Sequence, residues 1–241
     1  GLSLAEQIEY AKRTLGEKGK GLKYIAYFQS FTGTYGDLDA LERIYMQSAA
    51  YEGIVGVSIA TRPDCLGERE LDMLARLSEK TTLWVELGLQ TVHEKTAAYI
   101  RRGYGLDCYD RAMEALKKIP VHRITHIILG LPGESRADML ETVRYAGERT
   151  DGIKLQLLHV LEGTELADAY RAGRFETLEM EEYCGIVADA VALLPENVVI
   201  HRLTGDGAKK ELIAPAWSAD KKRVLNEINK ALNVRGIKAQ T

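Results

Sequence analysis

The sequence has few cysteines, and those it has stand alone. Only three occur in 241 residues, namely Cys65, Cys108 and Cys184. None forms a CxxC pair or another close ligand spacing, so the sequence indicates neither a disulfide framework nor a zinc site. We expect each to be an inert, partly buried thiol, because free cysteine packs as a small hydrophobic residue.

The sequence also lacks an excess of charge and a long hydrophobic run. The formal net charge is −3, from 32 basic and 35 acidic residues, which excludes a global attraction to nucleic acid or to membrane phosphate. No apolar run reaches the ~18 residues of a membrane span, and no signal peptide opens the sequence. The sequence therefore predicts a cytoplasmic protein that makes no membrane contact.

What the sequence does contain is a regular alternation of short apolar segments and amphipathic ones. The apolar segments predict six strands, at 24–28, 54–60, 82–89, 124–131, 153–160 and 198–203. Helices are expected at 4–15, 37–50, 68–80, 93–102, 108–118, 135–148, 165–172, 179–194 and 219–232. Ser3 with Glu6, and Ser135 with Asp138, have the spacing of helix-capping boxes.

This alternation predicts an α/β fold with a parallel sheet covered by helices. A complete eight-stranded barrel needs more strands, and a doubly wound sheet usually carries a GxGxxG motif that is absent here. We therefore predict a partial (β/α)6-type TIM-like barrel in one domain, 1–241. Residues 1–196 form its core, and 197–241 form an extension with an extra strand and helix. Because the chain opens on a helix, its first strand is expected to be missing.

Candidate functional residues follow the strands, since function gathers at the carboxyl ends of parallel strands. Glu86 is the main candidate, because a carboxylate inside an apolar strand must be paired or its burial is costly. A structural ion pair with an arginine or with Lys154 is the alternative. Gly130 and Gly133 bracket a tight turn that lets a ligand approach main-chain N–H groups, although ordinary strand-to-helix turns use the same residues.

Three histidines lie on or near successive predicted strands: His126, His159 and His201. With Glu86 or Asp206 they could form a metal centre of a hydrolase or lyase. However, His126 lies in the middle of its strand, whereas the other two lie near the ends of theirs. This placement argues against convergence on one ion, and a metal-dependent hydrolase is the weaker hypothesis.

Several segments together resemble the radical S-adenosylmethionine superfamily, in particular its elongator-catalytic-subunit-like group and its YhcC-type branch. The resemblance covers nearly the whole chain in the right order. It is carried by residues 27–35 (YFQSFTGTY), 58–64 (SIATRPD), 86–91 (ELGLQT), 101–104 (RRGY), 130–134 (GLPGE) and 203–206 (LTGD). Each motif is weak alone, and the set is specific.

The resemblance implies a six-stranded partial barrel that binds S-adenosylmethionine and a [4Fe–4S] cluster. Three closely spaced cysteines hold such a cluster, and reductive cleavage of the bound cofactor yields a 5′-deoxyadenosyl radical. The sequence has no such cysteine trio. We therefore expect the first strand and the cluster-binding loop to lie upstream of Gly1, the cluster to bind only to the full-length protein, and residues 1–241 alone to be inactive.

The resemblance also implies residue roles. Gln29 would lie near the methionine amino group, although its surroundings differ from the glycine-rich turn of many relatives. Glu86 and Gln90 would face the ribose and methionine portion of S-adenosylmethionine. The other residues implied to lie near the cofactor are Ser58, Arg62, Gly130, Gly133, Leu158 and His159. Tyr27, Lys154, Gln156 and Asp206 would line the substrate side.

The resemblance implies two partners, an electron donor such as flavodoxin or ferredoxin and a substrate that the sequence does not identify. Relatives that act on transfer RNA make RNA a candidate substrate. However, the modest basic cluster of Lys209, Lys210, Lys221, Lys222 and Arg223 has no interleaved aromatics and favours a solvated surface. The alternatives to a radical enzyme are the metal-dependent hydrolase or lyase and a binding module without catalysis.

Overall fold

The computed structural model describes residues 2–16, 22–29, 32–205 and 210–237. The chain forms two compact units, which are described separately: Gly1–Gly88 with Asp107–Ile124, and Leu89–Leu106 with Thr125–Thr241. In the part of the chain that the structure describes, no helix is long and apolar enough to cross a membrane. The expectation of one domain with a core at 1–196 and an extension at 197–241 stays a prediction.

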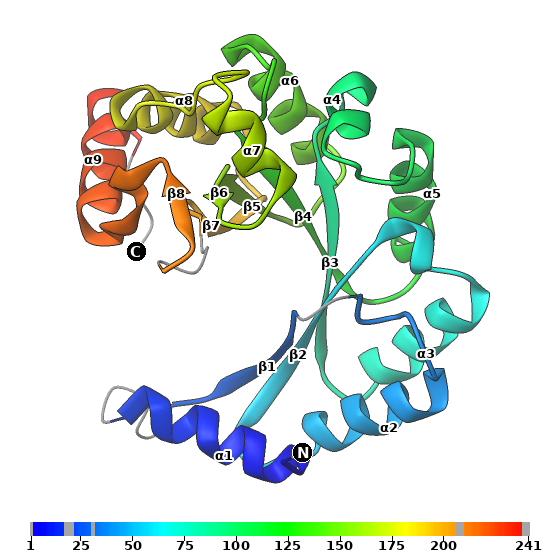
Figure 1. The fold of residues 1–241 in the computed structure, drawn as a ribbon. Coiled ribbons are helices and arrows are strands. Elements are labelled where there is room, and N and C mark those ends of the chain that lie inside the picture. The colour runs from blue at the N-terminus through cyan, green and yellow to red at the C-terminus, as the bar shows by residue number, and fades with distance from the viewer. Residues whose placement is uncertain (1, 17–21, 30–31, 206–209, 238–241) are drawn as a thin grey trace. The chain divides into compact units, whose positions relative to one another are not determined.

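Helices and strands alternate along the chain (Figure 1). The helices are α1 (Leu4–Leu15), α2 (Leu38–Ala49), α3 (Glu68–Ser78), α4 (Glu94–Tyr99), α5 (Leu106–Leu116), α6 (Arg136–Gly147), α7 (Glu165–Arg171), α8 (Met180–Leu193) and α9 (Lys221–Val234). The strands are β1 (Tyr24–Phe28), β2 (Ile54–Thr61), β3 (Thr82–Gln90), β4 (His122–Leu129), β5 (Gly152–Leu157), β6 (Val160–Leu161), β7 (Val199–Arg202) and β8 (Leu212–Ala214).

Six of the strands form one parallel sheet in the order β1-β2-β3-β4-β5-β7. Sequential strands are neighbours in this sheet, and a helix connects each pair, as a parallel sheet requires. All six predicted strands of the sheet are therefore present. The parallel α/β arrangement predicted from the alternating pattern is confirmed.

In the first unit, the core lies between the strands and the helices that follow them. Val57 and Ile59 on β2 are fully buried, as are Leu74 and Leu77 on α3. Ser58, between the two buried β2 residues, points to the opposite face of the sheet because strand side chains alternate. The apolar residues therefore fix which face of the sheet carries polar side chains.

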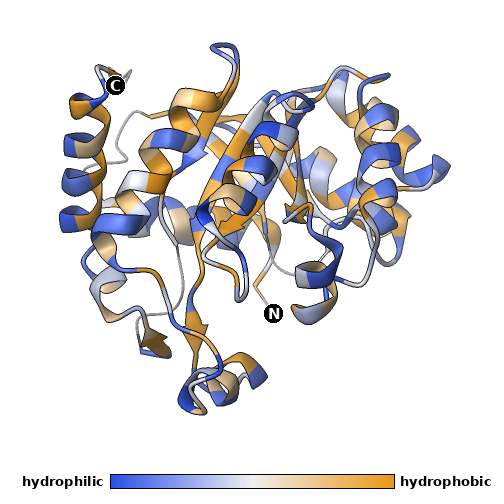
Figure 2. Cartoon of the chain, turned by 90° about the horizontal axis from the view of Figure 1, so that it is seen from above, coloured by the Kyte–Doolittle hydropathy of each residue, from blue (hydrophilic) through white to orange (hydrophobic). Residues whose placement is uncertain are grey.

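In the second unit, apolar and polar residues alternate along α9, the helix next to the C-terminus in Figure 2. On α9 the buried residues are Val224, Ile228 and Leu232, which are four residues apart and therefore share one face of the helix. α9 packs against α8, and α8 packs against α6. β5 is buried along nearly its whole length, with half-buried Gln156 as the exception. A strand covered on both faces has this composition.

The structure corrects one part of the predicted strand pattern. The segment 153–160 is not one strand, because β5 ends at Leu157 and Val160 belongs to β6. β6 pairs in antiparallel fashion with β8, which the sequence analysis missed, and the two form a separate small sheet. Val160, Ala167 and Ala214 form the buried centre of this region. Strands of two and three residues are too short to show a periodic pattern.

Candidate functional site

In the first unit, the polar centre is the carboxylate of Glu86 on β3. Glu86 is only 4% exposed, and both of its oxygens accept hydrogen bonds from hydroxyl groups. Ser58 Oγ donates to Oε1 at 2.6 Å, and Tyr27 Oη donates to Oε2 at 3.0 Å. Three neighbouring strands thus contribute to one buried polar group. The pairing of Glu86 that its burial required is provided at least in part by these two hydroxyls.

The strand register explains why these side chains meet. Tyr27 on β1 lies opposite Ser58 on β2, and Ala60 on β2 lies opposite Glu86 on β3. Side chains two residues apart on a strand point to the same face, so Ser58 and Glu86 project from one face of the sheet. The 2.6 Å bond between their oxygens follows from this register.

Two other residues predicted near the cofactor lie just beyond strands of the first unit. Gln29 is exposed directly after β1, and the Ser30 of the same motif lies outside the described residues. Arg62 follows β2 and forms a two-pronged ion pair with Asp64, at 2.9 Å from Nε and 2.7 Å from Nη2. The hydrogen bonds from Arg62 hold the pKa of Asp64 below its ordinary value. The Arg62 guanidinium is thus engaged within its own loop.

In the second unit, the glycines of the turn after β4 have a left-handed backbone. Gly130 and Gly133 have φ values of +89° and +85°, which favour glycine. A Cβ on Gly130 would come within 3.0 Å of Leu178, whereas a Cβ on Gly133 would meet nothing within 4 Å. The backbone at Gly133 is therefore open to a ligand. Leu158 lies beside Gly130, and its N–H donates to the Leu129 carbonyl at 2.9 Å.

Glu134, the residue after this turn, carries an unusual carboxylate. Its Oε1 accepts a hydrogen bond from Thr91 Oγ1 at 2.5 Å. Its Oε2 is buried and has no hydrogen-bond partner among the described residues. Burial raises the pKa of Glu134 above its ordinary value, and the Thr91 hydrogen bond opposes that rise. A buried acceptor left without a donor is unfavourable, because it has lost its hydrogen bonds to water.

The end of β3 is held in a rare conformation by a buried arginine. Gln90, predicted near the cofactor, has a φ of +65° although it is not glycine. Arg102 Nη1 donates to the carbonyls on both sides of it, at 3.2 Å to Leu89 and 2.6 Å to Thr91. The Arg102 side chain is 1% exposed. The hydrogen bonds of Arg102 therefore fix the main chain on both sides of Gln90.

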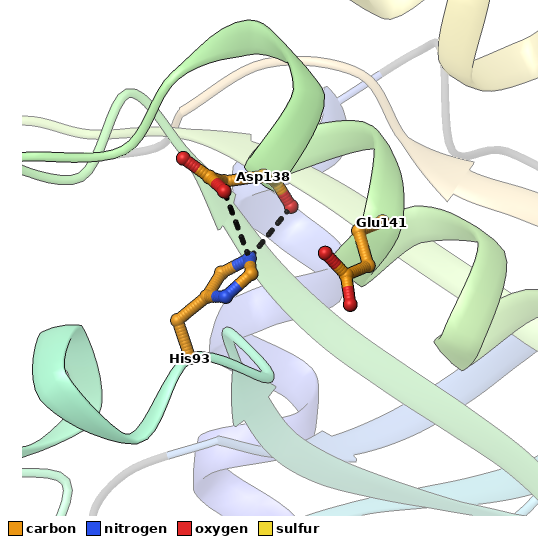
Figure 3. A group of neighbouring side chains, drawn as sticks. All are labelled: His93, Asp138 and Glu141. Carbon is orange, nitrogen blue, oxygen red and sulfur yellow. Dashed lines mark hydrogen bonds and ion pairs between the residues drawn. The ribbon is translucent and has the colours of Figure 1, made fainter.

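Figure 3 shows three side chains of the second unit whose ligand atoms lie within 4.8 Å of one another: His93, Asp138 and Glu141. His93 Nε2 lies 3.0 Å from the main-chain carbonyl of Asp138 and 3.9 Å from its carboxylate. The Asp138 carboxylate also closes the predicted capping box of α6 with Ser135. Helix capping and the histidine contact account for this arrangement, so it does not indicate a metal centre.

The histidines of the metal-hydrolase hypothesis have different surroundings. His126 Nδ1 lies 3.1 Å from Gln156 Nε2, the ring of His159 lies against Gly205, and His201 is exposed. Among the residues that the structure describes, these three form no group of converging ligand atoms.

The residues predicted for the substrate side are distributed as follows. Tyr27 is 38% exposed and contacts Glu86, while Gln156 contacts His126. Lys154 is 5% exposed and lies opposite Arg202 in the pairing of β5 and β7. Asp206 lies outside the described residues.

The three cysteines do not fit an iron–sulfur cluster. Cys65 and Cys108 are half-buried, and Cys184 is buried. Burial raises the pKa of all three thiols, that of Cys184 to about 11, whereas cluster iron is held by thiolates. No metal-ligating group of three side chains in the described ranges includes a cysteine. The three cysteines are isolated in the sequence, and their surroundings in the structure do not favour thiolates.

Sequence analysis assigned no role to Glu134, Thr91 or Arg102, although all three stand in quoted motifs. The only signal for Glu134 was its place directly after the glycine turn. For Arg102 the signal was a charged pair, Arg101-Arg102, before a glycine. Charge pairs of this kind are usually solvated, and only the tertiary structure separates the exposed Arg101 from the buried Arg102.

Three known proteins are similar to this chain over most of its length. The uncharacterized protein YtqA of Bacillus subtilis is 44% identical over 97% of this chain and 73% of its own length. Protein YhcC of Escherichia coli is 34% identical over 98% of this chain and 76% of its own length. A tRNA uridine(34) acetyltransferase of Methanocaldococcus jannaschii is 27% identical over 70% of this chain and 32% of its own length.

A solved structure and two family profiles complete the comparison. The archaeal Methanocaldococcus infernus Elp3 with an N-terminal deletion matches with a TM-score of 0.79 at 20% identity, over 97% of this chain and 59% of that chain. This likeness confirms the predicted TIM-like partial-barrel fold class. The profile of the Radical SAM C-terminal domain matches residues 150–233, and that of the Radical SAM superfamily matches residues 2–146. The chain belongs to the radical SAM superfamily.

Proposed function

We propose that this chain is the S-adenosylmethionine-binding body of a radical SAM enzyme. The observation that carries the proposal is the buried Glu86 carboxylate, which lies on the strand with the matching ELGLQT motif and is bound by Ser58. A carboxylate buried among hydroxyl groups is costly to maintain and is a common feature of functional sites. Family membership gives the class of cofactor that such a site serves.

The residues proposed to contact S-adenosylmethionine are those that the resemblance implies. In the first unit they are Gln29, Ser58, Arg62 and Glu86. In the second unit they are Gln90, Gly130, Gly133, Leu158 and His159.

One feature of the second unit fits such a ligand. The open backbone at Gly133 allows a close approach of the ligand to the main chain.

The chain's own residues would bind and orient the cofactor. Ser58 Oγ can accept a hydrogen bond from a ligand hydroxyl while it donates to Glu86, because a hydroxyl group does both. Glu86 would orient Ser58 and Tyr27 through its two oxygens. Radical SAM chemistry supplies a 5′-deoxyadenosyl radical once a reduced [4Fe–4S] cluster is present.

We infer that Cys65, Cys108 and Cys184 do not hold that cluster, because they are isolated and have raised thiol pKa values. No step of the reaction is therefore assigned to them. The isolated chain should bind S-adenosylmethionine weakly and should not cleave it. Cleavage would need a protein that holds the cluster and an electron donor such as flavodoxin or ferredoxin.

We propose RNA as the candidate substrate class. The tRNA uridine(34) acetyltransferase among the relatives favours RNA. In this chain the basic cluster at Lys210, Lys221, Lys222 and Arg223 is the feature that could contact phosphate, and its fifth member, Lys209, lies outside the described residues.

The first experiment measures binding of S-adenosylmethionine to the chain by calorimetry. We expect Glu86→Gln to weaken binding by about tenfold, since it removes a charged acceptor from the site. The matched control is Glu141→Gln, which changes an exposed acid on α6 and should leave the affinity unchanged. Equal affinities of wild type and Glu86→Gln would contradict the assigned role of Glu86.

The second experiment tests the reaction class in the full-length protein. After anaerobic reconstitution it should contain about four iron atoms per chain and release 5′-deoxyadenosine with a strong reductant. Full-length protein that neither holds iron nor cleaves S-adenosylmethionine would refute the proposed activity.

A further inference from the structure

The turn at the end of β3 has a strained backbone centred on Gln90. Thr91 N–H donates to the Leu89 carbonyl at 2.8 Å, which closes a three-residue γ-turn around Gln90. The central φ of +65° makes this the rare and strained form of the turn. Glutamine has no preference for this region, and such strain persists only where surrounding contacts impose it.

The guanidinium of Arg102 supplies those contacts. Its Nη1 bridges the Leu89 and Thr91 carbonyls, which flank Gln90 on either side. Its Nε donates to the Tyr104 carbonyl at 2.9 Å, and its Nη2 donates to the Glu94 carboxylate at 3.1 Å. A rigid, planar group with several fixed donors can hold two carbonyls at a set separation. Thr91 is further fixed by its bond to Glu134.

The chain also takes a strained path to bring Arg102 to this position. Helix α4 ends in a Schellman motif, in which Arg101 N–H donates to the Ala98 carbonyl and Arg102 N–H to the Ala97 carbonyl. The left-handed position of this motif is usually glycine, but here Arg101 occupies it with a φ of +54°. Gln90 and Arg101 are the only non-glycine residues with positive φ in the described part of the chain. Gln90 forms the strained turn, and Arg101 directly precedes Arg102, whose guanidinium acts as a clamp on that turn.

The burial of residues 89–91 indicates which side of the strand the Gln90 side chain faces. Gln90 is half-buried, whereas its neighbours Leu89 and Thr91 are fully buried. The turn therefore presents Gln90 toward the partly open side of the strand. The strained turn costs stability, and a fold that needed only to end a strand could use an ordinary turn.

We propose that Arg102 is a positioning residue that locks the γ-turn and so aims the Gln90 side chain at the bound S-adenosylmethionine. This inference rests on the proposed function, in which Gln90 contacts the cofactor. Arg102 itself contacts only the protein and acts through Gln90. Lysine is not an equivalent replacement, because its single ammonium group cannot bridge these carbonyls and also keep the bonds that Nε and Nη2 make to Tyr104 and Glu94, which fix the guanidinium in place.

The test is a double-mutant cycle in the full chain, with the affinity for S-adenosylmethionine measured by calorimetry. Gln90→Ala and Arg102→Lys should each weaken binding by about tenfold, which is the loss of one well-placed hydrogen bond. The double variant should also lose about tenfold, because both changes remove the same interaction. The control Glu141→Gln, which changes an exposed acid on α6, should leave the affinity unchanged. A hundredfold loss in the double variant, or wild-type affinity in Arg102→Lys, would overturn the proposal.

A second arm of the test measures stability without a ligand, so it tests the role of Arg102 independently of the proposed function. Gln90→Gly relieves the strain of the left-handed turn, so it should raise the thermal unfolding midpoint of the wild-type chain. In the Arg102→Lys background the turn can relax, and the gain from glycine should shrink. A gain of equal size in both backgrounds would overturn the clamp. If the clamp holds in this arm but wild type binds no S-adenosylmethionine, the proposed function fails and the aim of Gln90 at that cofactor fails with it.

Discussion

The two units hold the carboxylates of Glu86 and Glu134 in opposite ways. Glu86 in the first unit is 4% exposed, and both of its oxygens accept hydroxyl hydrogen bonds from neighbouring strands. Glu134 in the second unit uses one oxygen for Thr91, while the other is buried without a partner in the described part of the chain. The first carboxylate is satisfied by the fold. The second retains a buried acceptor that the described residues leave unsatisfied.

The difference lies in how completely each unit satisfies its own carboxylate. Around Glu86, hydrogen bonding joins β1, β2 and β3 and so fixes the polar face of that part of the sheet. Around Glu134, the unsatisfied oxygen and the strained turn at Gln90 are unfavourable without a ligand. Features of this second kind persist where function requires them, so changes there should affect binding more than stability.

The largest expected effect separates the two carboxylates by stability. Glu86→Ala should lower the free energy of unfolding by about 3 kcal/mol, because it leaves the buried Ser58 hydroxyl without its acceptor and creates a cavity. Glu134→Ala removes a carboxylate that is only partly satisfied and should cost about 1 kcal/mol or less. Urea denaturation of the chain measures both. Equal losses would refute the contrast.

A smaller effect compares the two hydroxyl donors to Glu86. Ser58→Ala should cost about 1 to 2 kcal/mol, since Ser58 is buried and its bond is to a carboxylate. Tyr27→Phe should cost about 0.5 kcal/mol, because Tyr27 is 38% exposed and water can replace its hydroxyl. Urea denaturation of both variants tests the order, and a larger loss in Tyr27→Phe would reverse the assignment of the stronger bond.

The sequence was sufficient for the parts of the fold that depend on local patterns. The capping box of Ser3 and Glu6 placed α1 at its observed bounds, and the strand at 24–28 was also correct. These elements have patterns of at least five residues. The small sheet of β6 and β8 depends on tertiary pairing of two and three residues, and no local pattern marks it.

The candidate site was predictable to the extent that it depends on burial. An acidic residue within the apolar strand 82–89 had to be paired, and this identified Glu86 correctly as a buried polar centre. The left-handed turn at Gln90 and its clamp by Arg102 were not predictable. Glutamine does not favour positive φ, and the hydrogen bonds that impose it come from a residue twelve positions later.

The smallest effect is the pH dependence that the second carboxylate confers. Burial raises the pKa of Glu134 in the folded protein above its unfolded value of about 4.5, so the folded state holds the proton more tightly. Its contribution to stability is therefore complete below that value and is lost as the pH rises through the folded pKa. Glu134→Gln removes this loss, so the stability of the variant relative to wild type should increase between pH 4 and pH 7.5.

The control for this prediction is Asp138, four residues further along the same segment. Hydrogen bonds from Ser135 hold the pKa of Asp138 below its ordinary value, so its contribution is present at neutral pH and is lost as the pH falls through that lowered pKa. Because that lowered pKa lies below the ordinary value of 3.8, the effect of Asp138→Asn on stability should change little between pH 4 and pH 7.5. Urea denaturation at both pH values measures the free energy of unfolding of the two variants. If Glu134→Gln shows as little pH dependence as Asp138→Asn, the Glu134 carboxylate is not held in an unfavourable, partly buried position, and the contrast with Glu86 fails.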